Sequence, residues 1–451
     1  GTAILPPAAA FGYGFSSRIA NVNRVGLQDI VFRYHASYGA STNVLVYLRN
    51  ATGTFAAPVT YTNSESHSWL VGTPDLNNDG YPDLVITHNV PSRIHIRLNN
   101  GAGGFGAATL YTVSTFCNGA KVYDMDNDGD LDIVAYSGVS SLSQNTISIL
   151  KNNGNGTFAA QVTTNTSVFG TSCQPADLDN DGDMDLAYTS NSAFSSAKVF
   201  RVYENDGNGA LSLSYNETNN PEKAVQTAFD YNGDGNADLI TRNPNTEIHL
   251  GNSGLNYTLN SPTVLSTEDG WPLSGDLDGD GDLDVFIGNS YNGSNWNTLP
   301  MKFLLNNGTG TFSTTTTSLV LASIWTSDLS DYDSDGDLDH LYLNPATGEI
   351  RVLLNGSNSA GSCIPNLVIS MNPVPNGAYH SLGDLLSHSS TVANGTSVLF
   401  TSDTAILLEY DFTVEPGATF EAYIQGCNSA APEPPHSALP TTRKEKGAQK
   451  D

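Results

Sequence analysis

Six short segments of the sequence place carboxylates in one spacing, D-x-[DN]-x-D-G-x-x-D. Side chains at positions 1, 3 and 5 can converge on one point, and glycine at position 6 permits the sharp turn. Ca²⁺ takes about six to eight oxygen ligands, and position 7 adds a backbone carbonyl while position 9 closes the shell. We therefore predict about six structural calcium ions. The predicted ligands are Asp75, Asn77, Asp79, Tyr81 and Asp83; Asp124, Asp126, Asp128, Asp130 and Asp132; Asp177, Asp179, Asp181, Asp183 and Asp185; Asp230, Asn232, Asp234, Asn236 and Asp238; Asp276, Asp278, Asp280, Asp282 and Asp284; and Asp331, Asp333, Asp335, Asp337 and Asp339.

A seventh copy of the segment, at residues 21–29, has lost most of its acids. Asn21, Asn23 and Val25 occupy positions 1, 3 and 5, whereas Asp29 remains at position 9. We expect this copy to bind metal weakly or not at all. The alternative for any single copy is an Asx-rich turn without metal, but six copies with the same ligand positions favour calcium.

The copies recur at a regular distance, which predicts a repeat fold. Their first positions are residues 21, 75, 124, 177, 230, 276 and 331, so successive units are 46 to 55 residues apart. Each unit contains about four short β-rich runs, as in a propeller blade. The acidic loop joins runs 1 and 2, and Asn-Gly turns such as "NNGNGTF" at 152–158 join runs 3 and 4.

The last unit lacks its fourth run, and residues 1–10 resemble the missing one. We expect residues 1–10 to complete the last blade and to remove the open sheet edges. The predicted fold class is all-β: a seven-bladed β-propeller with calcium loops over residues 1–360, followed by a small β-strand-rich C-terminal module.

The calcium loops and Asn-Gly turns resemble the FG-GAP/VCBS-type repeat propellers, which include integrin α heads and fungal propeller lectins. The resemblance covers about residues 1–360. It implies that the calcium loops lie on one face of the ring. It also implies that ligands bind on the opposite face or in clefts between blades.

Residues 361–428 form a separate pattern of short strands with Gly-marked corners. They resemble the small β-solenoid-like modules near the C-termini of exported bacterial surface proteins. The Pro-rich and charged residues 429–451 are expected to be disordered.

Cys363 and Cys427 bracket the module, and Cys117 and Cys173 precede two successive acidic loops. We expect two disulfides; the alternative is four buried thiols.

Aromatic residues indicate where a ligand could bind. Trp69, Trp271 and Trp325 each lie five or six residues before an acidic loop, and Tyr291 and Trp296 belong to the polar stretch 288–300. Aromatic faces stack on sugars, although these residues could instead pack between blades. A cationic group in the first two units could meet an acidic ligand or simply balance charge. Its members are Arg18, Arg33, His35, His88 and Arg93.

Composition narrows the function classes. The 46 acidic and 18 basic residues give a formal charge of −28, which argues against nucleic-acid binding. No apolar run reaches the ~18–20 residues that a membrane span requires, so we expect no membrane insertion. No recognisable catalytic motif is present, and we expect that the protein is not an enzyme.

The sequence favours a secreted lectin or cell-surface adhesin that binds a glycan or glycoprotein. The alternatives are a protein-binding adhesin of integrin-head type and, less favoured, a polysaccharide-degrading enzyme.

Overall fold

The computed structural model describes most of the repeat region and the strands of the C-terminal part. The described residues are 2–5, 13–25, 28–35, 41–50, 54–63, 65–114, 116–137, 145–190, 199–218, 223–242, 245–252, 263–267, 269–291, 301–316, 327–332, 338–344 and 349–353, with 363–364, 368–369, 377–381, 385–387, 391–392, 397–402, 406–408, 413–414 and 419–424. None of the described residues forms a helix suited to crossing a membrane. The chain divides into two units, Gly1–Ser357 and Asn358–Asp451.

The described residues of the first unit form seven four-stranded antiparallel sheets, which we number 1 to 7 along the chain. Sheets 1 to 3 are β2 (Tyr13–Ala20), β3 (Asp29–His35), β4 (Thr42–Tyr47) and β5 (Val59–Asn63); β6 (Ser66–Gly72), β7 (Leu84–Val90), β8 (Arg93–Arg97) and β9 (Thr109–Thr112); and β10 (Cys117–Tyr123), β11 (Asp132–Ser137), β12 (Thr146–Leu150) and β13 (Val162–Asn165). Sheets 4 to 7 are β14 (Ser172–Ala176), β15 (Asp185–Ser190), β16 (Val199–Asn205) and β17 (Leu211–Glu217); β18 (Ala224–Phe229), β19 (Asp238–Arg242), β20 (Thr246–His249) and β21 (Thr263–Ser266); β22 (Asp269–Gly275), β23 (Asp284–Tyr291), β24 (Lys302–Asn306) and β25 (Phe312–Thr316); and β26 (Ser327–Ser330), β27 (Asp339–Asn344), β28 (Glu349–Leu353) and β1 (Thr2–Leu5).

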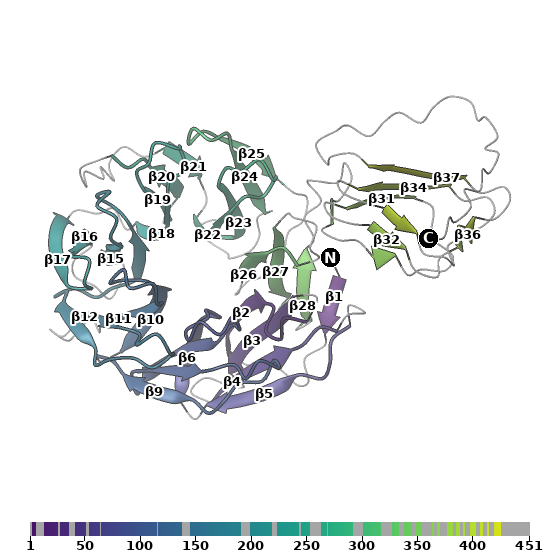
Figure 1. Cartoon of the computed structure of the whole chain (residues 1–451). Helices are drawn as coiled ribbons and strands as arrows, with labels where there is room; N and C mark the ends of the chain where they lie inside the picture. The colour runs from purple at the N-terminus through teal and green to yellow at the C-terminus, as the bar shows by residue number, and fades with distance from the viewer. Residues whose placement is uncertain are drawn as a thin grey trace, which may run out of the picture. The chain divides into compact units, whose positions relative to one another are not determined.

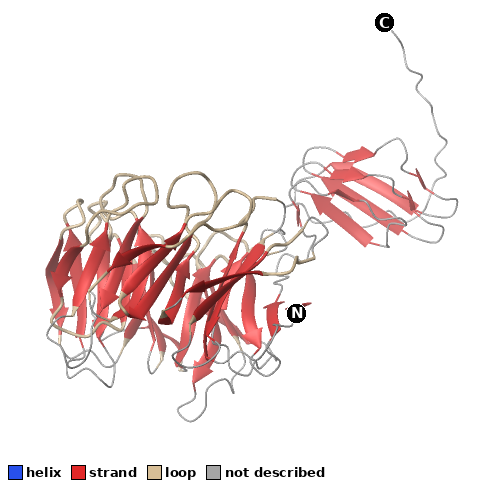
Figure 2. Cartoon of the chain, turned by 90° about the horizontal axis from the view of Figure 1, so that it is seen from below, coloured by secondary structure: helices blue, strands red, loops and turns tan. Residues whose placement is uncertain are grey.

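The seven sheets of this unit follow one another around a ring (Figure 1). The first strand of each sheet contacts the first strand of the next, and β26 of sheet 7 contacts β2 of sheet 1. Strand β1 pairs antiparallel with β28, with Thr2 opposite Val352, so the N-terminal strand is the outer strand of sheet 7. In side view the strands run from one face of the ring to the other, and described loops join them at the upper face (Figure 2). These features confirm the predicted all-β propeller.

Apolar clusters between neighbouring sheets hold the ring together. Val31 and Val46 of sheet 1 pack with Leu84 and Ile86 of sheet 2 in one cluster. The joint between sheets 1 and 7 has the same character, because Ile30 and Phe32 pack with Leu341 and Val352 of sheet 7. Burial of these side chains stabilises the ring by about 1.5–3 kcal/mol for each fully buried aliphatic or aromatic group.

An asparagine at the turn between the third and fourth strands ties each of several sheets to the preceding one. Asn152 of sheet 3 donates from Nδ2 to the carbonyl of Leu76 in the previous unit, at 2.7 Å. Equivalent bonds join Asn99 to Val22, Asn205 to Met125 and Asn306 to Tyr231. In sheet 1 an arginine takes this position: Arg49 Nη1 donates to the carbonyl of Tyr332 at 3.0 Å, and its guanidinium lies 4.1 Å from the Tyr332 ring centroid.

The predicted disulfide between Cys117 and Cys173 is wrong, because both side chains are buried free thiols. Cys117 belongs to the apolar cluster around Ile133, whereas Cys173 belongs to the cluster around Val134 on the other side of β11. Alternate residues of one strand point to opposite faces of a sheet. Sheet 3 therefore separates the two sulfurs. Burial raises the pKa of each thiol to about 12, so both remain protonated at neutral pH.

The C-terminal unit is built from parallel strands, unlike the first unit. Its described sheets are β29 (Cys363–Ile364), β31 (Gly377–Ser381), β34 (Ser397–Ser402) and β37 (Thr419–Ile424); β30 (Val368–Ile369), β32 (Leu385–Ser387) and β35 (Ile406–Leu408); and β33 (Thr391–Val392) with β36 (Thr413–Val414). Successive parallel strands in several sheets are typical of a solenoid, so the predicted small β-strand-rich module is confirmed. Cys427 and the stretch 429–451 lie outside the described residues, and so does the side chain of Cys363.

Candidate metal loops and a polar pocket

The aspartate at position 9 joins two parts of its own sheet in five of the acidic loops. Asp132 is fully buried, and it accepts the Met125 N–H on Oδ2 at 3.0 Å and the Asn152 N–H on Oδ1 at 2.7 Å. The same pair of bonds holds Asp83, Asp185, Asp238 and Asp284. This carboxylate therefore connects the start of the loop with the turn after the third strand.

The incomplete first loop keeps this connection. Asp29 accepts the N–H groups of Val22, at 2.9 Å, and Arg49, at 2.6 Å. Position 9 thus has a structural role that needs no acids at positions 1, 3 and 5. The sequence carried a signal of this role, because Asp29 persists where the other acids are lost.

Burial changes the ionisation of these aspartates. It raises the pKa of Asp83, Asp132, Asp185, Asp238 and Asp284 to about 6, with two backbone hydrogen bonds opposing the shift. Nearby loop carboxylates raise the pKa further, as Asp126 and Asp128 do for Asp132. A bound divalent cation would favour the ionised form of this group, because it offsets both the burial and the like charge.

Three loops bring three aspartates together at their centres. The groups are Asp124, Asp126 and Asp132; Asp177, Asp179 and Asp185; and Asp276, Asp278 and Asp284, each with one oxygen per residue within 4.8 Å of the others. Oxygens of Asp124, Asp126, Asp177 and Asp278 are buried without a hydrogen-bond partner among the described residues. An unpaired buried carboxylate oxygen is costly, and a cation would satisfy it. The donor set of these loops fits Ca²⁺.

In the two loops with asparagine at position 3, the side-chain amide of that asparagine donates a hydrogen bond to the aspartate at position 5. Asn77 donates from Nδ2 to Asp79 at 3.0 Å, and Asn232 does the same to Asp234 at 3.1 Å. Metal binding would require these amides to turn their oxygens inward. In the last loop Asp331 and Asp339 are described, whereas Asp333, Asp335 and Asp337 lie outside the described residues.

Neighbouring loops are also connected to one another. Asn78 at position 4 of one loop donates to Asp130 at position 7 of the next at 2.7 Å. Asn127 and Asp183 repeat this bond, and Asn180 donates to Asn236 at 2.7 Å. The acidic loops of sheets 2 to 5 therefore form one continuous surface.

The residue before the turn asparagine is a lysine in sheet 3 and a glutamate in sheet 4. We predict that the lysine lowers the calcium affinity of its neighbouring acidic loop and that the glutamate raises it. Lys151, just before the turn asparagine of sheet 3, has its Nζ 3.1 Å from Asp126 Oδ2. Glu204, at the same position in sheet 4, is a like charge beside Asp179. Lys151→Gln should strengthen calcium binding at loop 124–132 about fivefold. Glu204→Gln should weaken calcium binding at loop 177–185 by a similar factor. Each factor corresponds to a charge interaction of about 1 kcal/mol.

Native mass spectrometry that counts bound ions against free calcium measures both changes. Lys302→Gln is the control, because Lys302 begins a third strand, at the end of sheet 6 away from its acidic loop, and donates to Ser266. Changes of the same sign in the two loop variants would contradict the charge argument.

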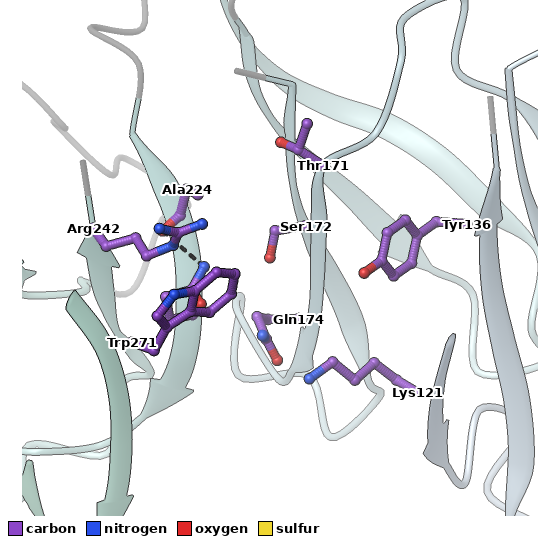
Figure 3. Close-up of a pocket in the computed structure, with 9 residues that line it drawn as sticks. Lys121, Tyr136, Thr171, Ser172, Gln174, Ala224, Arg242 and Trp271 are labelled. Carbon is purple, nitrogen blue, oxygen red and sulfur yellow. Dashed lines mark hydrogen bonds between the residues drawn. The ribbon is translucent and has the colours of Figure 1, made fainter. Parts of the chain in front are cut away.

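A polar pocket of about 210 Å³ opens among the inner strands of sheets 3 to 6. Its lining residues are Lys121, Tyr136, Thr171, Ser172, Gln174, Ala224, Gln226, Arg242 and Trp271 (Figure 3). Thr171 and Ser172 lie at the start of a first strand and Arg242 at the end of a second strand, whereas the acidic loops join the other ends of these strands. The pocket therefore lies toward the face away from the acidic loops.

Two cationic side chains border the pocket in an otherwise acidic protein. The Arg242 guanidinium lies 3.7 Å from the Trp271 ring centroid, so the indole orients it. Lys121 comes from the opposite side (Figure 3). Burial lowers the pKa of Lys121, and the charge of Arg18 lowers it further. An anionic group between Lys121 and Arg242 would stabilise both cations.

The predicted ligand residues lie in different environments, and some lie outside the described residues. Trp69 and Trp271 are exposed, at 42% and 45%, and only Trp271 belongs to the pocket. One face of Trp271 is covered by Arg242, which the sequence did not indicate. Trp296, Trp325 and the side chain of Tyr291 lie outside the described residues. In the predicted cationic group, Arg33, His35 and His88 are buried, so these three side chains do not face a surface ligand.

Comparison with known proteins gives matches to a repeat family and to solved propellers. The family model for the FG-GAP-like repeat matches residues 75–135, 136–188 and 276–342. No curated protein matches the chain. An Agrocybe aegerita lectin, described as recognising non-reducing terminal N-acetylglucosamine, is 19% identical with a TM-score of 0.47, over 68% of this chain and 80% of that one.

Two further solved structures show the range of proteins with this likeness. BBS1N in complex with ARL6DN is 12% identical with a TM-score of 0.47, over 78% of this chain and 97% of that one. The Photorhabdus luminescens Tc holotoxin pore is 14% identical with a TM-score of 0.36, over 72% of this chain and 16% of that one. At these identities the likeness concerns the fold alone.

Proposed function

From the FG-GAP-like repeats that this chain carries and from its β-propeller fold, we propose that it is a calcium-stabilised binding protein whose ligand is a carbohydrate. The pocket beside Trp271 carries this proposal. Its hydroxyl and amide side chains, Ser172, Gln174 and Gln226, suit the hydroxyl groups of a sugar. Pockets for drug-sized ligands measure about 300–1,000 Å³, so this smaller one suits a single terminal sugar unit.

The charges at the pocket favour a sugar with an acidic group. A carboxylate or sulfate could pair with Arg242, which the Trp271 ring holds in one orientation, while Lys121 supplies a second cation. We also propose that calcium stabilises the fold. Its sites are the three loops in which three aspartates converge, and these loops contain Asp124, Asp177 and Asp276. We further propose that the protein acts outside the cell, where calcium is plentiful enough for modules of millimolar affinity.

We expect Trp271→Ala and Arg242→Gln each to weaken binding of an acidic oligosaccharide by more than tenfold. Each change removes a group of the pocket, and a hydrogen-bonded charge contributes about 1.5–3 kcal/mol, or more than tenfold in affinity. A glycan array on the calcium-loaded chain, with neutral and acidic sugars side by side, identifies the ligand, and titration calorimetry compares the variants.

Trp69→Ala is the matched control, since Trp69 is equally exposed on an inner strand but lies outside the pocket. Absence of binding to every sugar would reject the carbohydrate proposal. If the chain still binds a glycoprotein after its glycans have been removed, the protein-binding adhesin is favoured instead. Equal binding of neutral and acidic sugars would reject only the charge preference.

A further inference from the structure

Two histidines and a glutamate meet inside sheet 2, apart from the acidic loops and the polar pocket. Glu65 lies directly before β6, His88 is in β7 and His95 is in β8. In the strand register His88 is opposite Arg93, and His95 is opposite Ile86. The two histidines are therefore diagonal neighbours on one face of the sheet. Their exposed fractions are 0% for His88 and 3% for His95, and that of Glu65 is 9%.

The three side chains are close enough to bind one ion. One ligand atom from each lies within 4.8 Å of the others. His95 Nε2 is 3.4 Å from Glu65 Oε2, and the two imidazole centroids are 3.9 Å apart. Two ligands of a tetrahedral zinc ion, with bonds of about 2.0–2.1 Å, are themselves about 3.3 Å apart. The His95–Glu65 separation matches that value.

Among the described residues, the ring nitrogens of these histidines have few hydrogen-bond partners. Neither ring nitrogen of His88 makes a hydrogen bond to any described residue, and the same holds for His95 beyond its contact with Glu65. Buried polar groups nearly always have a partner, so two imidazoles without one are exceptional. A metal binds imidazole through a ring nitrogen that carries no proton.

The donor atoms of this cluster decide which metal suits it, and two arginines lie beside them. Arg93 Nη1 lies 3.3 Å from Glu65 Oε1, and Arg33 is buried nearby, with Nη2 donating to the carbonyl of Ser68. Ca²⁺ and Mg²⁺ are held by oxygen ligands, and the only oxygen ligand among these three side chains is the Glu65 carboxylate. Imidazole nitrogen suits zinc, copper and nickel instead. We propose that Glu65, His88 and His95 bind one Zn²⁺ or a transition metal of similar chemistry, with a fourth position left to water.

A second buried pair in the chain shows how such groups are satisfied without metal. In sheet 5, Glu247 lies 3.9 Å from His249, and Lys223 forms a close ion pair with the same Glu247 oxygen. His249 also bonds to the Thr241 hydroxyl at 2.9 Å. Here a lysine and a hydroxyl complete the cluster. His249 is therefore a matched control for the histidines of sheet 2.

Cobalt(II) tests the proposal in the full chain. With the acidic loops saturated by excess calcium, Co²⁺ should bind with one equivalent and give the visible absorption of a four-coordinate site, and Zn²⁺ should displace it. His88→Gln and His95→Gln should each weaken Co²⁺ binding by more than about 100-fold, because loss of even an outer partner of a metal ligand costs about 10–100-fold. His249→Gln should leave binding unchanged.

Zinc anomalous diffraction from wild-type crystals gives a test that needs no variant. A peak among Glu65, His88 and His95 is expected. No saturable Co²⁺ binding to the calcium-loaded wild type, or no such peak, would overturn the proposal. Equal loss in His249→Gln and His88→Gln would overturn it as well. Glycan binding is independent of this site, so failure here leaves the proposed function standing.

Discussion

Removal of calcium is expected to lower the melting temperature by on the order of 10 °C. A ligand that binds only the folded state adds about 2.7 kcal/mol per site at a hundredfold excess over its dissociation constant. The three loops with three converging aspartates would together add about 8 kcal/mol. Without the ion, their buried and unpaired carboxylate oxygens oppose folding.

Thermal unfolding in calcium and in excess EDTA measures this effect. Magnesium is the control, because it demands stricter octahedral geometry and should restore only part of the loss. Asp124→Asn, Asp177→Asn and Asp276→Asn should each remove about one third of the calcium-dependent shift. The same melting temperature in calcium and in EDTA would contradict the calcium assignment.

Asp185→Ala is expected to destabilise the protein by about 2–6 kcal/mol even in EDTA. The change leaves the buried N–H groups of Leu178 and Asn205 without their acceptor, at about 1–3 kcal/mol each. Because Asp185 connects two parts of sheet 4, this loss does not depend on metal. Urea unfolding with and without calcium measures it.

Asp181→Ala is the matched control within the same loop. Asp181 is exposed at position 5, where its Oδ1 accepts the Asp183 N–H of the same loop. Its substitution should matter in calcium and have little effect in EDTA. If Asp185→Ala were harmless in EDTA, position 9 would be a metal ligand only, and the structural role argued from Asp29 would be wrong.

The repeat fold could be predicted from the sequence because each unit carries its own turn chemistry. The Gly at position 6 has a positive φ in every described acidic loop, for example 96° at Gly182, and the Asn-Gly turns need the same freedom. The regular spacing of these turns, 46 to 55 residues from one acidic loop to the next, then leaves room for four short strands in each unit. The pairing of β1 with β28 followed from the missing run in the last unit.

Other features depend on three-dimensional neighbours and could not be predicted. The stacking of Arg242 on Trp271 joins different sheets, and no local spacing indicates it. The face that each cysteine takes depends on strand register, since a shift of one residue reverses it. Glu65, His88 and His95 have no metal-binding spacing in the chain, and only the hairpin register and the packing before β6 bring them together.

The pairing of β1 with β28 has a consequence for how the chain is made. Thr2 is synthesised well before its strand partner Val352, which follows 350 residues later in the chain. Until then sheet 7 does not exist, and a nascent ring of six sheets has two open edges. Contacts of such long sequence range form slowly. During that interval β1 of one chain can pair with β28 of another, which is the geometry of a domain-swapped dimer.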